Sequence, residues 1–306
     1  MREPLMISIV IVSWNVRDLL QNCINSLQLA LQDYSYELII VDNHSKDETV
    51  NWVKENVPEA ILIESEKNLG FGPANNLGIK MAKGKYLFLL NPDTIVNENA
   101  IQIMVDYLES HPNTGCVGPK LLNPDGSLQI SSYPFPTVFK EFWRLFHLDK
   151  ISPISQYPVD FWNDGYIRSV DVLQGAALLI PCSVFQRIGC FDEQFFMYTE
   201  EVDLCFRIKQ SGLKNIWISS SEVIHFGGQS TRQAAFQMFL ELYVSKIRFI
   251  RKYYSNLSLL TYKVILFFAS VSRVFFLQLA NSFSPDDGRL ALMNNYLNLI
   301  RALPGI

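Results

Sequence analysis

The chain has 306 residues, of which 49% are hydrophobic and 18% are charged, and its formal net charge is −4. This composition can bury one large core with an appended element and excludes a disordered protein. The charge is uneven, because residues 242–284 carry six Lys or Arg and no carboxylate, which leaves −10 on the remainder. An acidic remainder without a recognised nucleic-acid module argues against a nucleic-acid partner.

Cysteine usage and the N-terminus indicate the compartment. The five cysteines are odd in number and show no CxxC spacing, which argues against a disulfide framework and a thiolate metal site. We therefore expect a reducing cytosol. Residues 1–4 lead directly into a β-branched run without the cationic flank, apolar stretch and cleavage site of an export signal, so we do not expect export.

The first ninety residues alternate short apolar runs with amphipathic segments. The β-branched run 7–12 predicts a buried strand, and residues 16–30 have the apolar spacing of a helix. The pattern recurs, with strands predicted at 37–41, 60–64 and 85–90, helices at 45–56 and 73–82, and a Gly-rich loop at 68–72. Alternating strands and helices are typical of βαβ units and of an α/β fold with a mostly parallel sheet.

The rest of the chain is less regular until its last third. Residues 131–164, rich in Pro and aromatics, predict a long loop with short helices. Strands are predicted at 170–181 and 214–218 with a helix at 200–210 between them, and long helices at 234–254 and 257–283. The change to long, nearly unbroken helical sequence predicts a domain of residues 1–228 and a helical extension of residues 229–306.

Four polar segments each follow a short apolar run: Asp42-Asn43, Asn91-Pro92-Asp93, Glu200-Glu201-Val202-Asp203 and His225. Polar side chains at strand ends lie where α/β sheets bind ligands, so the sequence predicts a nucleotide-dependent enzyme. Each segment also has a structural interpretation. Asp42 could close a turn and His225 could cap a strand end, whereas acidic residues at a helix start are stabilised by the helix dipole. Asp203 and Arg207, four residues apart, predict a supporting ion pair.

The order of these segments resembles glycosyltransferase family 2 of the GT-A fold, and within it bacterial rhamnosyltransferase-like enzymes. Seven segments between residues 7 and 230 carry the resemblance: IVIVSWN at 9–15, VDNHSKD at 41–47, NLGF at 68–71 with Asn75-Asn76, NPD at 91–93, QGA at 174–176, YTEEVDL at 198–204 and HFGGQS at 225–230. The resemblance implies transfer of a sugar from a nucleoside diphosphate donor.

The resemblance also implies roles for residues around the donor. Asp42 would accept a hydrogen bond from the imide N–H of uracil or thymine, and Asp93 and His225 would hold a divalent cation, Mg²⁺ or Mn²⁺. Asn91 stands where many GT-A enzymes have the first Asp of Asp-x-Asp, and its uncharged amide would attract the metal less strongly. The expected donor-binding residues are Ser13, Asn15, Asp42, Asn43, Asn68, Gly70, Asn76, Asn91 and Asp93.

On the acceptor side, the resemblance makes Glu201 the general base of an inverting transfer, although the family pattern has Asp there and Glu is one methylene longer. Glu200, Gly175 and Ala176 would contact the acceptor, a saccharide or a polyprenyl-linked saccharide in cell-surface polysaccharide synthesis. The branch of the family suggests dTDP-rhamnose as donor. A nucleotidyltransferase and a non-catalytic sugar-nucleotide-binding scaffold stay open as alternatives, although residues 13–17 lack the Gly-rich triphosphate loop that the first requires.

The C-terminal helices combine aromatics and leucines with cations. Lys263 and Arg273 interrupt the apolar stretch 257–279, so we do not expect it to span a membrane, which takes about 20 apolar residues. We expect instead a helical hairpin on an anionic membrane surface, with Lys and Arg reaching lipid phosphates. The protein would then be peripheral on the cytoplasmic face of the inner membrane. The alternative is a packing or dimerisation hairpin.

Overall fold

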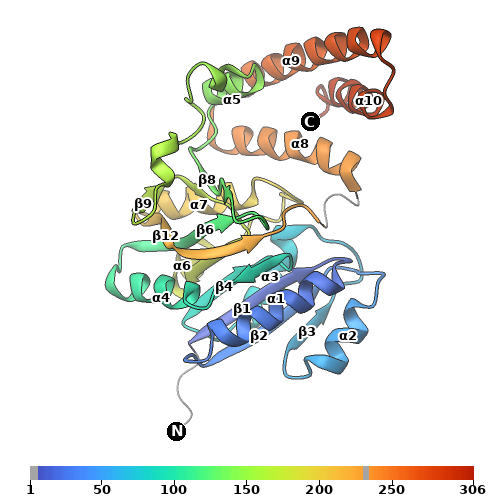
Figure 1. The fold of residues 1–306 in the computed structure, drawn as a ribbon. Helices are drawn as coiled ribbons and strands as arrows, with labels where there is room; N and C mark the ends of the chain where they lie inside the picture. Colours follow the sequence, from blue (N-terminus) through green and yellow to red (C-terminus); the bar gives the residue numbers. More distant parts are fainter. Residues whose placement is uncertain (1–5, 230–233) are drawn as a thin grey trace. The chain divides into compact units, whose positions relative to one another are not determined.

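A computed structural model describes residues 6–229 and 234–306 (Figure 1). The N-terminal residues 1–5 and Ser230 of the last motif lie outside the described residues. The described chain forms two compact units, one of residues 6–135, 158–196 and 200–229 and one of residues 136–157, 197–199 and 234–306. The predicted domain boundary near Gly228 stays a prediction.

The first unit contains a large mixed sheet, mostly parallel, with strand order β3-β2-β1-β4-β11-β6-β12-β5. Strand β1 pairs in parallel with β2 and β4, and β6 pairs in parallel with β12, whereas β11 runs antiparallel between β4 and β6. The strands are β1 Ile7–Ser13, β2 Tyr36–Asp42, β3 Ile61–Glu64, β4 Tyr86–Leu90, β5 Thr94–Val96, β6 Thr114–Leu122, β7 Leu128–Gln129, β8 Ser132–Tyr133, β9 Ile167–Val170, β10 Val172–Leu173, β11 Ala177–Pro181 and β12 Lys214–His225.

Helices cover both faces of this sheet, because successive side chains of a strand point to opposite faces. Ile7, Ile9 and Ile11 belong to a buried cluster with residues of α1 and α4, whereas Val10 lies against Gly78 of α3 on the other face. The helices of this unit are α1 Arg17–Ala30, α2 Thr49–Asn56, α3 Phe71–Met81, α4 Ala100–Ser110, α6 Cys182–Ile188 and α7 Glu200–Gln210, with a short turn of 3-10 helix, η2 Val159–Trp162.

The sequence missed part of this unit. No prediction covered β5, α4 and β6, which together bring the chain from β4 to the far half of the sheet. The single strand predicted at 170–181 falls on three short strands, β9, β10 and β11, with breaks at Asp171 and at 174–176. Strand β12 continues past the predicted end at Ile218 to His225 through an irregularity between Ile218 and Glu222.

The second unit is helical, with α5 Val138–Leu145, η1 Leu148–Lys150, α8 Ala235–Tyr253, α9 Asn256–Phe283 and α10 Asp287–Ala302. Its core joins Tyr243 and Ile247 of α8 to Leu266 of α9 and Leu299 of α10, all buried. Helix α10 was not predicted. Neither Lys263 nor Arg273 breaks α9, which among the described helices is the one long and apolar enough to cross a membrane.

Several of the predicted lipid-facing cations have partners inside this unit. Lys246 Nζ lies 3.1 Å from the buried carboxylate of Glu141, and Arg248 is paired with Glu241 at 2.7 Å. The Arg273 guanidinium donates to the Leu145 carbonyl at 2.5 Å. Three of the six cations are thus paired within the protein and are less available to lipid phosphates. Arg251 and Lys252 at the end of α8 are exposed.

Candidate functional site

Two buried polar side chains end neighbouring strands at the carboxyl edge of the sheet. Ser13 of β1 and Asp42 of β2 are register partners, and their exposed fractions are 0% and 3%. Asp42 Oδ2 accepts a hydrogen bond from the backbone N–H of Ser45 at 3.0 Å, which is the turn interaction that the sequence left open. Within the described residues, Asp42 Oδ1 and Ser13 Oγ have no hydrogen-bond partner. Buried polar atoms are usually paired, so these two are candidates for ligand contacts.

Asn43 and Asn68 hold the Gly-rich loop. Asn43 Nδ2 donates to Asn68 Oδ1 at 3.1 Å and to the Gly70 carbonyl at 3.0 Å, and its Oδ1 accepts from Leu69 N–H at 2.8 Å. Gly70 has a positive φ of 84°, and a Cβ there would lie 1.9 Å from the Phe196 carbonyl oxygen. The close approach that requires glycine is therefore to the protein's own backbone. The donor role predicted for these residues stays a prediction, and their visible function is to shape the loop.

Asn76 and Asn15 also have partners within the protein. Asn76 is 3% exposed, and its amide pairs with both backbone groups of Phe191 and with Glu193. Asn15 has a positive φ of 52°, and its Oδ1 accepts from Lys46 N–H at 2.6 Å. The Asn76 side chain is thus hydrogen-bonded to the 191–193 segment, and Asn15 lines a hollow.

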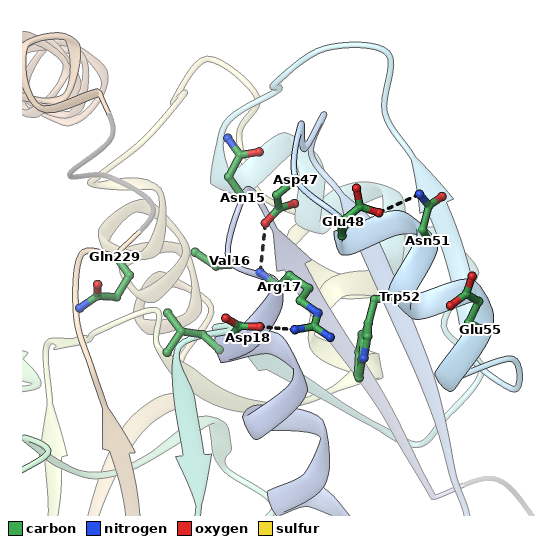
Figure 2. A pocket seen from close by; sticks show the side chains of 11 residues that line it. Asn15, Val16, Arg17, Asp18, Asp47, Glu48, Asn51, Trp52, Glu55 and Gln229 are labelled. Atoms are coloured by element: carbon green, nitrogen blue, oxygen red, sulfur yellow. Dashed lines mark hydrogen bonds and ion pairs between the residues drawn. The ribbon is translucent and has the colours of Figure 1, made fainter.

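This hollow has a volume of about 850 Å³ (Figure 2). Arg17 lies over the ring of Trp52, 5.9 Å from its centroid, and Gln229 approaches from the loop after β12. The charged lining consists of one cation and four carboxylates, namely Arg17, Asp18, Asp47, Glu48 and Glu55. A lining of net negative charge disfavours a diphosphate, and of the predicted site residues only Asn15 reaches this hollow.

The residues predicted to hold a cation come together. His225 Nε2 lies 3.3 Å from Asp93 Oδ1 and 3.4 Å from Asn91 Nδ2, and the side chains of His225 and Asp93 are 5% and 9% exposed. The backbone fixes the pair, because Phe226 N–H donates to the Asp93 carbonyl at 2.9 Å. No group of three or more His, Cys, Asp or Glu ligands occurs in the described part of the chain. Two buried polar side chains thus lie side by side here, and their role as cation ligands stays a prediction.

The antiparallel strand β11 brings the QGA segment to the same edge. Leu90 at the end of β4 pairs with Ala177 at the start of β11, and the Asn91 N–H donates to the Ala176 carbonyl at 2.9 Å. Ala176 is 1% exposed and its side chain lies in the core. Gly175 is different, since a Cβ there would lie 3.6 Å from Glu201 Cβ and 3.3 Å from the Phe71 ring. A side chain at Gly175 would therefore crowd Phe71 and Glu201.

The two glutamates at the start of α7 differ in exposure. Glu200 is 4% exposed, whereas Glu201 is half-buried. The Tyr133 hydroxyl donates to Glu201 Oε1 at 2.9 Å. Burial raises the pKa of Tyr133 well above its usual value of 10, and the adjacent carboxylate raises it further, so the phenol stays protonated and donates. The more accessible carboxylate is therefore held by a neutral donor. The predicted ion pair between Asp203 and Arg207 is confirmed at 2.8 Å.

Sequence reasoning missed two polar residues that contact this site. Tyr133 reaches Glu201, and Gln129 Oε1 lies 2.7 Å from His225 Nδ1. Both belong to strands of two residues, β7 and β8, at the edge of a segment without periodicity. Strands this short give no alternating pattern, so the sequence carries no signal for them.

Comparison with known proteins identifies the family. The model of glycosyl transferase family 2 matches residues 8–161, which is half of the chain. The chain belongs to glycosyltransferase family 2. This confirms the predicted family, and the mixed, mostly parallel sheet with covering helices confirms the GT-A fold of this glycosyltransferase.

Relatives of this glycosyltransferase include two bacterial rhamnosyltransferases. It is 28% identical over 242 residues to the N-acetylglucosaminyl-diphospho-decaprenol L-rhamnosyltransferase of Mycobacterium tuberculosis, covering 73% of this chain and 76% of the relative. It is 26% identical over 239 residues to the rhamnosyltransferase WbbL of Escherichia coli, covering 74% and 86%. Among solved structures it is similar to the mannosyltransferase PcManGT of Pyrobaculum calidifontis in complex with GDP-Man and Mn²⁺, with a TM-score of 0.56, 13% identity and coverage of 98% and 86%.

Proposed function

We propose that this glycosyltransferase transfers a sugar, L-rhamnose from dTDP-rhamnose, to a saccharide or polyprenyl-linked saccharide acceptor with inversion. The observation that carries the proposal is the hydrogen bond from Asn91 N–H to the Ala176 carbonyl. It joins the Asp93–His225 pair, through adjacent residues, to Gly175 and Glu201 at one edge of the sheet. The transfer of rhamnose is supported by the names of the two bacterial relatives, and the lipid-linked acceptor by the name of the mycobacterial one.

In this proposal the buried pair binds a divalent cation. Adjacent ligands of an octahedral Mg²⁺ or Mn²⁺ with bonds of about 2.1 Å lie about 3 Å apart, close to the 3.3 Å between Asp93 Oδ1 and His225 Nε2. A carboxylate oxygen and an imidazole nitrogen suit such ions, so the residues present fit the group. When bound, such a cation would stabilise the negative charge that develops on the leaving diphosphate. Few protein ligands are expected for a cation that binds together with phosphates.

The chain's own residues would do the remaining work. Asp42 Oδ1 accepts from the imide N–H of the donor base, which provides the partner that this oxygen lacks. Glu201 removes the proton of the acceptor hydroxyl as the new bond to the anomeric carbon forms. Tyr133 holds the carboxylate, and Gly175, where a side chain would crowd Phe71 and Glu201, would lie beside the acceptor. A base opposite the leaving diphosphate produces inversion.

A donor screen tests the proposal. Thermal unfolding of the protein would be measured with UDP-, dTDP- and GDP-sugars, each with and without Mn²⁺, because a ligand that binds the native state raises its apparent stability. We expect the largest shift with dTDP-rhamnose and Mn²⁺, followed by release of dTDP when acceptor is added. Donor binding without any transfer to saccharide acceptors would favour the non-catalytic scaffold, and incorporation from a nucleoside triphosphate would favour the nucleotidyltransferase.

We also propose that the helical unit binds an anionic membrane surface through α9. One face of this helix exposes large apolar residues at helical spacing: Leu257, Leu260, Val264, Phe267, Phe268, Val271, Phe275, Phe276, Leu279 and Phe283. The exposed cations Arg251 and Lys252 lie at the adjoining end of α8. An apolar face with nearby cations is the pattern of helices that lie in the headgroup region. Location on the cytoplasmic side would bring the enzyme to its lipid-linked acceptor.

Vesicle flotation tests this surface. The variant Phe268→Glu with Phe275→Glu should lose binding to anionic vesicles, and the variant Arg251→Glu with Lys252→Glu should lose the salt-dependent part of it. Leu29→Glu, an exposed apolar position on α1, is the matched control and should float like the wild type. Wild-type protein that does not float at low salt, or that forms a tight dimer lost in the double Phe variant, would show that this face is a protein interface.

A further inference from the structure

Gln129 contacts the His225 ring on the side away from Asp93. Its Oε1 lies 2.7 Å from His225 Nδ1. Its Nε2 donates to the His225 backbone carbonyl at 3.1 Å and to Asn123 Oδ1 at 2.9 Å. Gln129 lies on the short strand β7, which is held to β6 by the pairing of Gln129 with Leu121. One side chain thus binds both the ring and the backbone of the histidine.

The surrounding acceptors fix which end of the Gln129 amide faces the ring. The His225 carbonyl can only accept, so the NH₂ group must point to it. Asn123 is oriented in the same way, because its Nδ2 donates to the Leu128 carbonyl at 3.3 Å and its Oδ1 is then turned towards Gln129. The carbonyl oxygen of Gln129 is therefore the atom that meets His225 Nδ1. An oxygen at 2.7 Å requires a hydrogen on that nitrogen.

In a neutral ring, a hydrogen on Nδ1 determines what the other nitrogen presents. In the neutral imidazole only one nitrogen carries hydrogen, so Nε2 has its lone pair directed towards Asp93 Oδ1 at 3.3 Å and towards the amide of Asn91 at 3.4 Å. The Nε2 lone pair and the Asp93 Oδ1 atom lie close enough to bind the same cation. With the opposite tautomer, Nε2 would donate to Asp93 and would be closed to a metal.

We infer that Gln129 is a positioning residue that keeps His225 in the Nδ1–H tautomer and so prepares Nε2 to bind the divalent cation. The inference rests on the proposed function in one respect, namely that His225 is a cation ligand. Gln129 itself contacts neither cation nor donor. Outer contacts of this kind orient a ligating ring, and their removal typically weakens metal binding by 10- to 100-fold.

The test compares two variants of Gln129 with a matched control. Gln129→Met keeps the length and removes the acceptor, whereas Gln129→Glu keeps an acceptor for Nδ1–H. Gln102→Met changes an exposed glutamine of α4 whose amide donates to Asp106. The ¹⁵N shifts of the imidazole would be measured without metal, with the His225 signal assigned by its loss in His225→Asn. Mn²⁺ binding would be measured by electron paramagnetic resonance of the free ion, with and without uridine diphosphate.

We expect the Nδ1–H tautomer in the wild type, in Gln102→Met and in Gln129→Glu, and a mixture in Gln129→Met. Mn²⁺ affinity should fall by about 10- to 100-fold in Gln129→Met and recover to within a few-fold of the wild type in Gln129→Glu. An Nε2–H tautomer in the wild type, or unchanged tautomer and affinity in Gln129→Met, would overturn the role of Gln129 and leave the proposed function standing. A wild-type protein that binds no Mn²⁺ under either condition would overturn the cation site itself, and the inference with it.

Discussion

Asp42→Asn separates base recognition from the turn that Asp42 also closes. The carboxylate has two different environments, since Oδ2 accepts the Ser45 N–H at 3.0 Å and Oδ1 is buried without a partner in the described structure. In the Asn variant the single oxygen can keep the bond to Ser45. The amide NH₂ then takes the place of Oδ1, where it would face the imide N–H of the base, donor against donor.

The expected loss of binding free energy is that of one hydrogen bond to a charged group, about 1.5–3 kcal/mol. Donor and nucleotide affinity should therefore fall roughly 10- to 150-fold, since each 1.4 kcal/mol is a factor of ten. Thermal stability without ligand should change little, because the turn bond survives and the substitution removes a buried charge.

Calorimetric titration with dTDP and UDP measures this effect. Asp125→Asn is the matched control, because Asp125 closes a similar turn by accepting the Ser127 N–H at 2.9 Å at a fully exposed position. Wild-type affinity in Asp42→Asn would refute the assignment of Oδ1 to the base. A loss of affinity together with a lower unfolding temperature would instead show that Asp42 acts mainly through its turn.

Three further results are expected. Tyr133→Phe should lower the rate of transfer about 10-fold at unchanged nucleotide affinity, because the phenol orients Glu201. Steady-state kinetics with a separate nucleotide titration measures this effect, and an unchanged rate would remove Tyr133 from the mechanism. Lys246→Met should destabilise the protein by about 3 kcal/mol in urea unfolding, because it leaves the Glu141 carboxylate buried beside Arg144 alone, whereas Lys252→Met at an exposed position should have little effect. Burial alone would raise the pKa of Glu141, but Lys246 and Arg144 outweigh burial and lower this pKa below 4.5. The stabilisation by the Glu141 carboxylate is therefore present above pH 4.5 and is lost as the pH falls through the lowered pKa. Acid unfolding of Glu141→Gln should depend less steeply on pH than that of the wild type, and equal steepness would contradict this assignment.

The sequence predicted the elements whose signal is local. The apolar runs at 7–12 and 37–41 became β1 and β2. Asp42 ends β2 and Asn91 directly follows β4, because hydrophobic runs end where the chain leaves the sheet. Helix α3 begins at Phe71, two residues before the prediction, since Gly72 and Pro73 are tolerated in a first turn.

The missing parts depend on contacts between distant residues. Nothing in the run 177–181 shows that β11 is antiparallel to β4, yet that direction brings Gly175 to the edge where Asn91 lies. The cations of α8 form another example. Lys246 looks like a surface charge until folding brings Glu141, 105 positions away, against it. Periodicity reports the face of an element and carries no information about its partner.

In the proposed mechanism, Glu201 is the base of sugar transfer at this edge of the sheet. The most direct test is the rate of transfer by Glu201→Gln with saturating donor, measured beside Glu200→Gln and with nucleotide affinity determined for each. We expect a fall of about 10²- to 10⁴-fold in Glu201→Gln at nearly unchanged nucleotide affinity, and partial activity in Glu201→Asp. Near-normal transfer by Glu201→Gln, with the loss appearing in Glu200→Gln, would contradict it.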